Sequence, residues 1–160
     1  YTQAITFASR LHEAYPSRAT AYFDRPEFRK AISDYNAAIS IDSDIPMYFS
    51  DRGNTRYAMG DYQSAVADYN RAIEIDPDYS QAYERRGWAF LGLDELAKAE
   101  ADFDKALKLA PGDACAQSGR AEVYQRQNKP VPERSTGLSF DNLRRMVEQP
   151  GEAAAKKDHP

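Results

Sequence analysis

The sequence predicts an all-α fold in which antiparallel helix pairs stack into a solenoid. Three observations support this prediction: residues recur every 34 positions along the 160-residue chain, apolar residues within each repeat follow helical spacing, and helix-breaking residues fall at two fixed places in each repeat. The columns include Tyr35, Tyr69 and Phe103; Ala38, Ala72 and Ala106; Ile39, Ile73 and Leu107; and Arg18, Arg52, Arg86 and Arg120. One helix pair cannot bury both of its faces, so neighbouring pairs must share a continuous core.

The two breaks in each repeat are marked by proline and by residues that tolerate a positive φ. Pro77 ends the second helix of a pair, because the residue before a proline is disfavoured in the helical region. Gly60 supplies the left-handed residue that ends the first helix, and Asp61 is placed to cap the next one. Asp94 and Asn128 occupy the column of Gly60 in later repeats, and both residue types tolerate this conformation.

The first repeat has a proline, Pro26, in the column of Gly60. A proline ring fixes a negative φ. We therefore expect this turn to differ from the others, with Asp24 as the N-cap of the following helix and Glu27 reaching back toward it in a capping box.

The period divides the chain into three full repeats flanked by partial ones. We expect residues 1–11 to form the second helix of a truncated preceding repeat, because Tyr1 and Ala4 fall on the columns of Tyr35 and Ala38. The expected boundaries are 12–45, 46–79 and 80–113 for the full repeats, 114–128 for a half repeat, 129–149 for a linker and a C-terminal capping helix, and 150–160 for a disordered tail. The alternative role of the helix in 129–149 is docking on another protein.

The charge of the chain argues against a nucleic-acid partner. It carries 21 Lys and Arg against 25 Asp and Glu, a formal net charge of −4, with no basic tract, whereas neutralising phosphates supplies most of the affinity for nucleic acids. No stretch approaches the roughly 20 apolar residues of a membrane-spanning helix, so we expect no insertion into a membrane. Cys115 is the single cysteine, which excludes an internal disulfide and fits either the cytosol or an exported, periplasmic protein.

The sequence offers no catalytic constellation, metal site or cofactor motif. His12 and His159 lie at opposite ends of the chain, without cysteine or carboxylate companions at metal-ligand spacing. Cys115 has no candidate base beside it, and we expect it to be a partly buried small hydrophobic residue. We therefore expect a non-catalytic protein without a cofactor.

The repeat resembles the tetratricopeptide repeat family. The residues that carry the resemblance, besides the period itself, are Gly87, Phe90, Ala99, Phe103, Ala106 and Pro111. It covers residues 12–113 and the half repeat at each end. The resemblance implies a right-handed superhelical solenoid that binds partners on the concave surface lined by the first helix of each repeat.

The family's groove columns, carried over to this chain, give the candidate partner-binding residues. These are Met47, Asp51, Asn54 and Tyr57 from the second repeat, Gln81, Arg85 and Trp88 from the third, and Glu122 from the last half repeat; the same columns include Ser50, Glu84, Leu91 and Cys115. Trp88 stands out, because aromatic anchors carry a disproportionate share of binding energy. The alternative is that a neighbouring helix buries Trp88 in the core.

Some members of the family bind the acidic C-terminal tails of chaperones with a clamp of two Lys, two Asn and one Arg. The corresponding positions here are Pro16, Thr20, Asp51, Gln81 and Arg85, so only the arginine is kept. Without the lysines, and with a negative Asp51, most of the charge-assisted bonding to such a tail is lost. We expect no binding of that kind.

The arginine column has a structural and a functional interpretation. Asp34, Asp68 and Asp102 recur with the same period, so we favour a ladder of Arg-to-Asp bonds between adjacent helices over binding of an anionic ligand. The sequence leaves open whether Arg52 reaches Asp34 or Asp68. Arg56 stands where other repeats have an aromatic residue, and we expect its stem to lie along apolar surface while its head group reaches solvent or an acid.

These expectations converge on a non-catalytic protein–protein interaction module that holds a partner peptide or segment in the concave groove. The alternative is a structural or oligomerisation segment of a longer repeat array that acts through its open ends. We expect the chain to be a monomer or to self-associate weakly.

Overall fold

A computed structural model describes residues 14–129 of the chain. The expected partial repeat at 1–11, the tail at 150–160 and all but the first residue of the 129–149 segment lie outside this part. Every regular element within the described residues is a helix. Residues 14–23 are helical, and the helices that follow are α2 (Phe28–Ile41), α3 (Pro46–Ala58), α4 (Tyr62–Ile75), α5 (Ser80–Gly92), α6 (Leu96–Leu109) and α7 (Ala114–Arg126).

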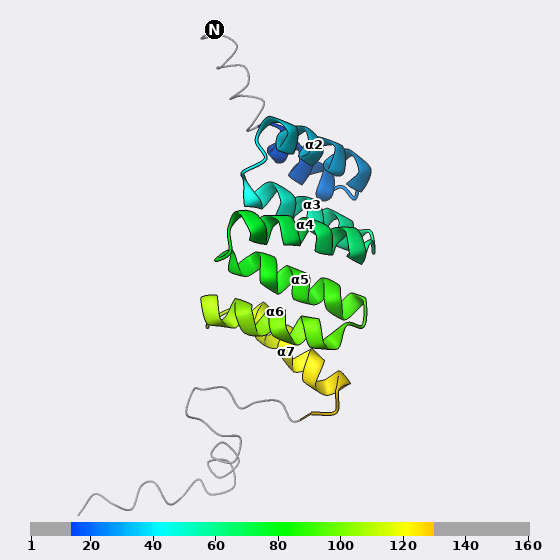
Figure 1. Ribbon diagram of the computed structural model, residues 1–160. Coiled ribbons are helices and arrows are strands. Elements are labelled where there is room, and N and C mark those ends of the chain that lie inside the picture. The colour runs from blue at the N-terminus through cyan, green and yellow to red at the C-terminus, as the bar shows by residue number, and fades with distance from the viewer. Residues whose placement is uncertain (1–13, 130–160) are drawn as a thin grey trace, which may run out of the picture. The chain divides into compact units, whose positions relative to one another are not determined.

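Consecutive helices lie side by side in chain order (Figure 1). The pairs α3 with α4 and α5 with α6 pack most extensively, and α2–α3, α4–α5 and α6–α7 contacts join one pair to the next. The first helices of the pairs also contact each other directly, α3 with α5 and α5 with α7, and so form one continuous layer. The described residues are thus an all-α solenoid of stacked helix pairs, as the sequence predicts.

The core repeats with the period of the sequence. The alanine columns at 31, 65 and 99 and at 38, 72 and 106 are completely buried, and the aromatic column of Tyr35, Tyr69 and Phe103 is buried beside them. Glycine lets a first helix approach these rings: a Cβ on Gly53 would lie 2.7 Å from the ring of Tyr69, and one on Gly87 would lie 2.8 Å from the ring of Phe103. The small residues therefore set how closely the paired helices pack.

The arginine column joins each repeat to the one before it. Arg52 of α3 donates from Nε and Nη2 to the carboxylate of Asp68 in α4, at 3.0 and 2.6 Å, and from Nη1 to the side-chain oxygen of Asn36 in α2, at 2.6 Å. Asp68 also accepts from Arg56 at 2.9 Å, so the head group of Arg56 does reach an acid. One arginine thus bridges the second helix of its own repeat and the second helix of the preceding repeat.

Arg86 repeats this geometry one period later. It donates to both carboxylate oxygens of Asp102 at 2.7 Å and to the side-chain oxygen of Asn70 at 2.6 Å. The ladder interpretation of the arginine column is therefore confirmed. Of the two aspartates that the sequence left open for Arg52, the structure shows Asp68. Arg52 and Arg86 each pair with the aspartate 16 residues later, because that residue lies on the partner helix of the same pair.

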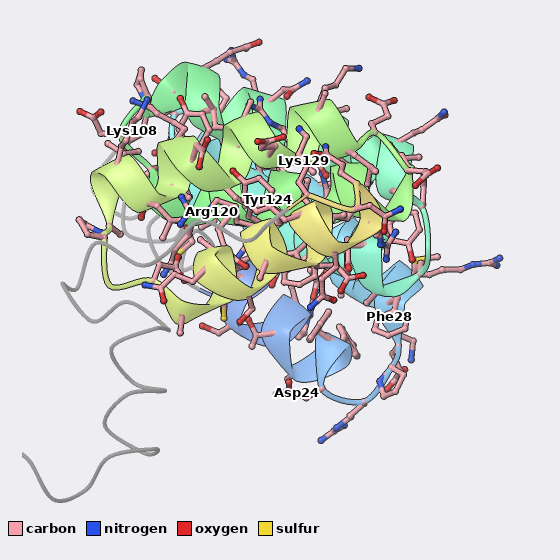
Figure 2. The ribbon with its side chains drawn as sticks, turned by 90° about the horizontal axis from the view of Figure 1, so that it is seen from below. Asp24, Phe28, Lys108, Arg120, Tyr124 and Lys129 are labelled. Carbon is pink, nitrogen blue, oxygen red and sulfur yellow. The ribbon has the colours of Figure 1, made fainter. Side chains whose placement is uncertain are left out.

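The first and last arginines of the column, Arg18 and Arg120, each make one of the two contacts of the ladder within the described residues. Arg18 donates to both carboxylate oxygens of Asp34, at 2.6 and 2.7 Å. Arg120 of α7 donates to Asp104 of α6 at 3.1 Å. Asp104 occupies the column of Asn36 and Asn70, so Arg120 keeps the backward bond of the ladder. Figure 2 shows α7 in front of α6, with Arg120 and Tyr124 in the space between the two helices.

The turns that follow the first helices share one geometry. Gly60, Asp94 and Asn128 have φ values of +79°, +58° and +52°, as their column predicts. Asp61 caps α4 by accepting a hydrogen bond from the backbone N–H of Ser64 at 3.2 Å, which confirms the predicted cap. A six-residue hydrogen bond closes the turn, from the N–H of Asp61 to the carbonyl of Arg56 at 3.0 Å.

The expectation of a different turn in the first repeat is wrong. Pro26 has a φ of +33°, and the N–H of Glu27 donates to the carbonyl of Tyr22 at 2.9 Å, which is the same closure as in the later turns. Glu27 itself is the N-cap of α2 and makes no side-chain cap, because its carboxylate pairs with Lys30. The packing of the pair imposes the common turn on a residue whose ring opposes it, so Pro26 is strained.

Replacing Pro26 with glycine is expected to raise the free energy of unfolding by about 1 kcal/mol, since relief of the strained φ exceeds the entropy that glycine adds to the unfolded chain. Urea unfolding followed by circular dichroism measures the change. Pro77→Gly is the matched control and is expected to lower stability by about 0.5 kcal/mol, because only the entropic effect operates there. A less stable Pro26→Gly protein would contradict the strain.

Replacing Arg86 with alanine is expected to lower the free energy of unfolding at pH 7 by about 3–5 kcal/mol, because it leaves a buried carboxylate unpaired. Burial raises the pKa of Asp102, and the hydrogen bond and charge of Arg86 oppose that rise. Without Arg86, the pKa of Asp102 in the folded protein rises further. The loss of unfolding free energy therefore becomes smaller as the pH falls through this pKa, because Asp102 is then neutral. Denaturant titrations at pH 7 and pH 5 test this.

The control is Arg71→Ala, which removes an exposed pair with Glu74 on the same helix at 2.9 Å. Its cost should stay within about 0.5 kcal/mol at both pH values. A loss for Arg86→Ala no larger than this control would show that the ladder contributes little to stability.

Candidate functional site

The candidate residues lie along the layer of first helices. Met47, Asp51, Asn54 and Tyr57 are in α3, Gln81, Arg85 and Trp88 are in α5, and Glu122 is in α7. Their spacing of three or four positions within each helix places them on one helix face. We define the α3/α5 face as Asp51, Asn54, Tyr57, Glu84, Arg85 and Trp88.

An ion pair links the two helices of this face. Arg85 Nη1 of α5 lies 3.8 Å from Asp51 Oδ1 of α3, and both side chains are half-buried. The same oxygen of Asp51 accepts a hydrogen bond from the Asn54 amide at 3.3 Å. Burial raises the pKa of Asp51, while the charge of Arg85 and the Asn54 bond act in the opposite direction. Desolvation outweighs both partners, so Asp51 is incompletely compensated.

A second link runs from the face down to the aromatic column of the second helices. The hydroxyl of Tyr69 donates to Asn54 Oδ1 at 2.9 Å, and one repeat earlier the hydroxyls of Thr20 and Tyr35 lie 3.4 Å apart. One repeat later the same two columns hold Trp88 and Phe103 instead. Thr20 and Asn54 thus lie within hydrogen-bonding distance of a tyrosine hydroxyl, whereas Trp88 contacts the ring of a phenylalanine.

Trp88 is partly buried, at the edge of the core. Its ring meets that of Phe103 edge to face, with centroids 5.5 Å apart, and it packs against the core cluster while remaining partly exposed. Glu84 lies one turn earlier on the same helix, close enough for the indole to lower the pKa of its carboxyl. The indole is therefore held in one orientation at the surface of α5.

Glu84 belongs to the same group of side chains. Burial raises the pKa of Glu84, Asp113 adds to the rise, and the charge of Arg85 and the indole of Trp88 oppose it. Tyr57 lies close enough to Glu84 for that charge to contribute to the raised pKa of its phenol, although burial is the larger cause. Tyr57 also packs against Tyr62, with ring centroids 5.1 Å apart.

The structure does not bring all of the predicted residues together. Met47 is 49% exposed in the first turn of α3, and Gln81 is exposed at the matching place in α5. Glu122 pairs with Arg126 of its own helix at 2.8 Å. The interactions of the described residues do not connect these three to the α3/α5 face.

Three further residues of the groove columns differ in exposure from what the sequence predicts. Ser50 is completely buried, and among the described residues its hydroxyl has no hydrogen-bond partner. Leu91 is also buried and belongs to the core cluster around Phe103. Cys115 was expected to be partly buried but is exposed, because it stands in the first turn of α7 in the column of the exposed Met47 and Gln81.

Sequence reasoning missed the contribution of Tyr35 and Tyr69. The sequence marked them only as a repeat column, whereas in the structure their rings are buried and their hydroxyls reach residues of the first helices. A signal was present, because the column changes from tyrosine to phenylalanine in the repeat where Asn54 is replaced by Trp88.

The described residues contain no group of three or more His, Cys, Asp or Glu placed to hold a metal ion. None of the helices searched within 14–129 combines the length and the apolar character that crossing a membrane requires.

Comparison with known proteins identifies the family. Residues 50–114 match the family model described as tetratricopeptide repeat. None of the curated proteins matches this sequence. Together with the fold and the solved structures described below, the match shows that residues 50–114 are tetratricopeptide repeats, a family that is generally a non-catalytic protein-interaction fold.

Solved structures of this family resemble the chain over most of its length. The TPR domain of Arabidopsis OM64 is 26% identical, with a TM-score of 0.72, and the match covers 74% of this chain and 98% of that domain. The second TPR domain of human RPAP3, in complex with the HSP70 peptide SGPTIEEVD, is 27% identical, with a TM-score of 0.69 and coverage of 72% and 97%. The first TPR of Spaghetti (RPAP3), bound to the HSP90 peptide SRMEEVD, shares the fold at 24% identity, with a TM-score of 0.72 and coverage of 76% and 96%.

Proposed function

We propose that the chain is a protein–protein interaction module whose α3/α5 face holds an extended or helical segment of a partner protein. The observation that carries this proposal is the position of Trp88, which is half-buried and packs edge to face against Phe103. A rigid aromatic at the surface buries a large apolar area on binding and loses little side-chain entropy.

The neighbourhood of Trp88 supports the same role. Tyr57 adds a second half-buried aromatic, and Asn54, Asp51 and Arg85 supply polar groups that can fix the orientation of a bound backbone. The first helices contact one another, so these groups belong to one continuous layer. The RPAP3 domains, which have the same fold, hold short peptides in their structures, and this supports a peptide as the kind of ligand.

The alternative, a structural segment that acts through its open ends, depends on Tyr1, Ala4 and Ile5. These residues lie outside the described part of the chain, and this alternative stays a prediction from the sequence.

Replacing Trp88 with alanine is expected to weaken peptide binding by about 2 kcal/mol, or about 30-fold in Kd, because the anchor of the face is lost. Nonapeptides are selected with the intact chain from a random phage-displayed library, synthesised, and titrated by fluorescence anisotropy. Ile41→Ala is the control, since Ile41 is an exposed apolar residue of α2, a second helix. Unchanged affinity in Trp88→Ala, with helicity retained, would contradict the site.

The acidic peptides SRMEEVD and SGPTIEEVD are expected not to bind this chain. Of the five clamp positions only Arg85 is cationic, and it already lies 3.8 Å from Asp51. A carboxylate-rich peptide would therefore bring negative charge beside two half-buried carboxylates with a single shared cation. Calorimetry should show no saturable heat, with the first RPAP3 TPR domain as the positive control for SRMEEVD. Saturable binding to the chain would overturn the expectation.

A further inference from the structure

The charges of the α3/α5 face are unbalanced. Asp51 and Glu84 share one cation, Arg85, which lies 3.8 Å from Asp51, beyond hydrogen-bonding distance. Asp51 accepts a long hydrogen bond of 3.3 Å from Asn54, and Trp88 lies close enough to Glu84 to lower the pKa of its carboxyl, so each carboxylate has a neutral neighbour in addition to the shared arginine. The three charged groups therefore carry one net negative charge in a partly desolvated place.

The other arginines near this layer are engaged elsewhere. The ladder arginines of the helix at 14–23, α3 and α5 are held by aspartates of the second helices, and Arg120 of α7 is held by Asp104. Arg126 pairs with Glu122 and donates to the backbone carbonyl of Leu91. Among the described residues, an acidic ligand at the α3/α5 face would thus meet Arg85 alone, and would compete with Asp51 for it.

Two more acids extend the negative charge beyond the face. Asp24, in the turn before α2, acts on the phenol of Tyr35, and Asp113, the N-cap of α7, acts on Glu84. Figure 2 shows Asp24 at the turn that precedes α2. Asp113 therefore adds negative charge near Glu84, and Asp24 adds negative charge near Tyr35.

We infer that the segment bound by the α3/α5 face is basic, and that a Lys or Arg side chain of the partner pairs with Asp51 and Glu84 while its aliphatic stem lies against Tyr57 and Trp88. This inference rests on the proposed function, since it names the chemistry of the segment held there. A guanidinium or ammonium group supplies the charge that the two carboxylates lack, and the adjacent aromatic rings favour a cation over their faces. The partner is thus opposite in charge to the peptides held by the RPAP3 domains, whose printed sequences end in Glu-Glu-Val-Asp.

The test uses the nonapeptides selected above with the intact chain. Peptides whose binding depends on Trp88 are expected to carry a net positive charge, and replacing their Lys or Arg residues with Gln should weaken binding about tenfold or more. The double variant Asp51→Asn, Glu84→Gln should weaken the parent peptide to a similar extent and should erase its preference over the Gln-substituted one. Glu74→Gln on α4 is the matched control and should change nothing, because Glu74 is exposed and pairs with Arg71.

A measurement on the wild-type chain keeps the test independent of variant folding. Affinity for the basic peptides should fall as NaCl is raised from about 50 to about 500 mM, because screening weakens charge pairing. If the Trp88-dependent peptides are neutral or acidic, or bind the double variant unchanged, the basic partner is refuted while the proposed function stands. If no selected peptide depends on Trp88, the proposed function itself is refuted.

Discussion

The structure depends on one repeated interaction, in which an arginine of a first helix bridges two second helices. Arg52 binds Asp68 within its own repeat and Asn36 in the preceding one, and Arg86 binds Asp102 and Asn70 in the same way. Apolar packing alone is non-directional and would tolerate small shifts of one pair against the next. The bidentate geometry of the guanidinium fixes that register, because each carboxylate and each amide oxygen accepts from a defined direction.

The same interaction decides which charges reach the surface. Arg85 and Arg86 are neighbours in sequence, but successive residues of a helix point about 100° apart. Arg86 is therefore held between second helices, whereas Arg85 lies on the α3/α5 face beside Asp51. The ladder takes most of the basic side chains of the first helices out of reach of a ligand, and the face is left acidic in a chain whose formal net charge is only −4.

Proteins that share this fold can differ in the residues available to bind a ligand. The chain shares its fold with domains whose structures contain acidic peptides, yet the positions that would clamp such a peptide include Asp51 and only one cation. The small, aromatic and ladder residues form the buried contacts of the helix pairs, whereas the α3/α5 face consists of other positions of the first helices, so a shared fold does not imply a shared ligand. Within this chain, Asn54 contacts Tyr69 in one repeat, and Trp88 contacts Phe103 at the same two positions of the next.

The helices, their breaks and the stacked architecture could be predicted from the sequence, because they follow from local preferences repeated every 34 residues. These preferences are the alanine and aromatic columns at helical spacing, and Gly60 and Asp61 at a turn. Tertiary structure alone decided which aspartate Arg52 binds, that Pro26 adopts a positive φ, and how far Trp88 emerges from the core. These outcomes depend on how one helix lies against the next, and that geometry is a property of the packed pair, which no single segment encodes.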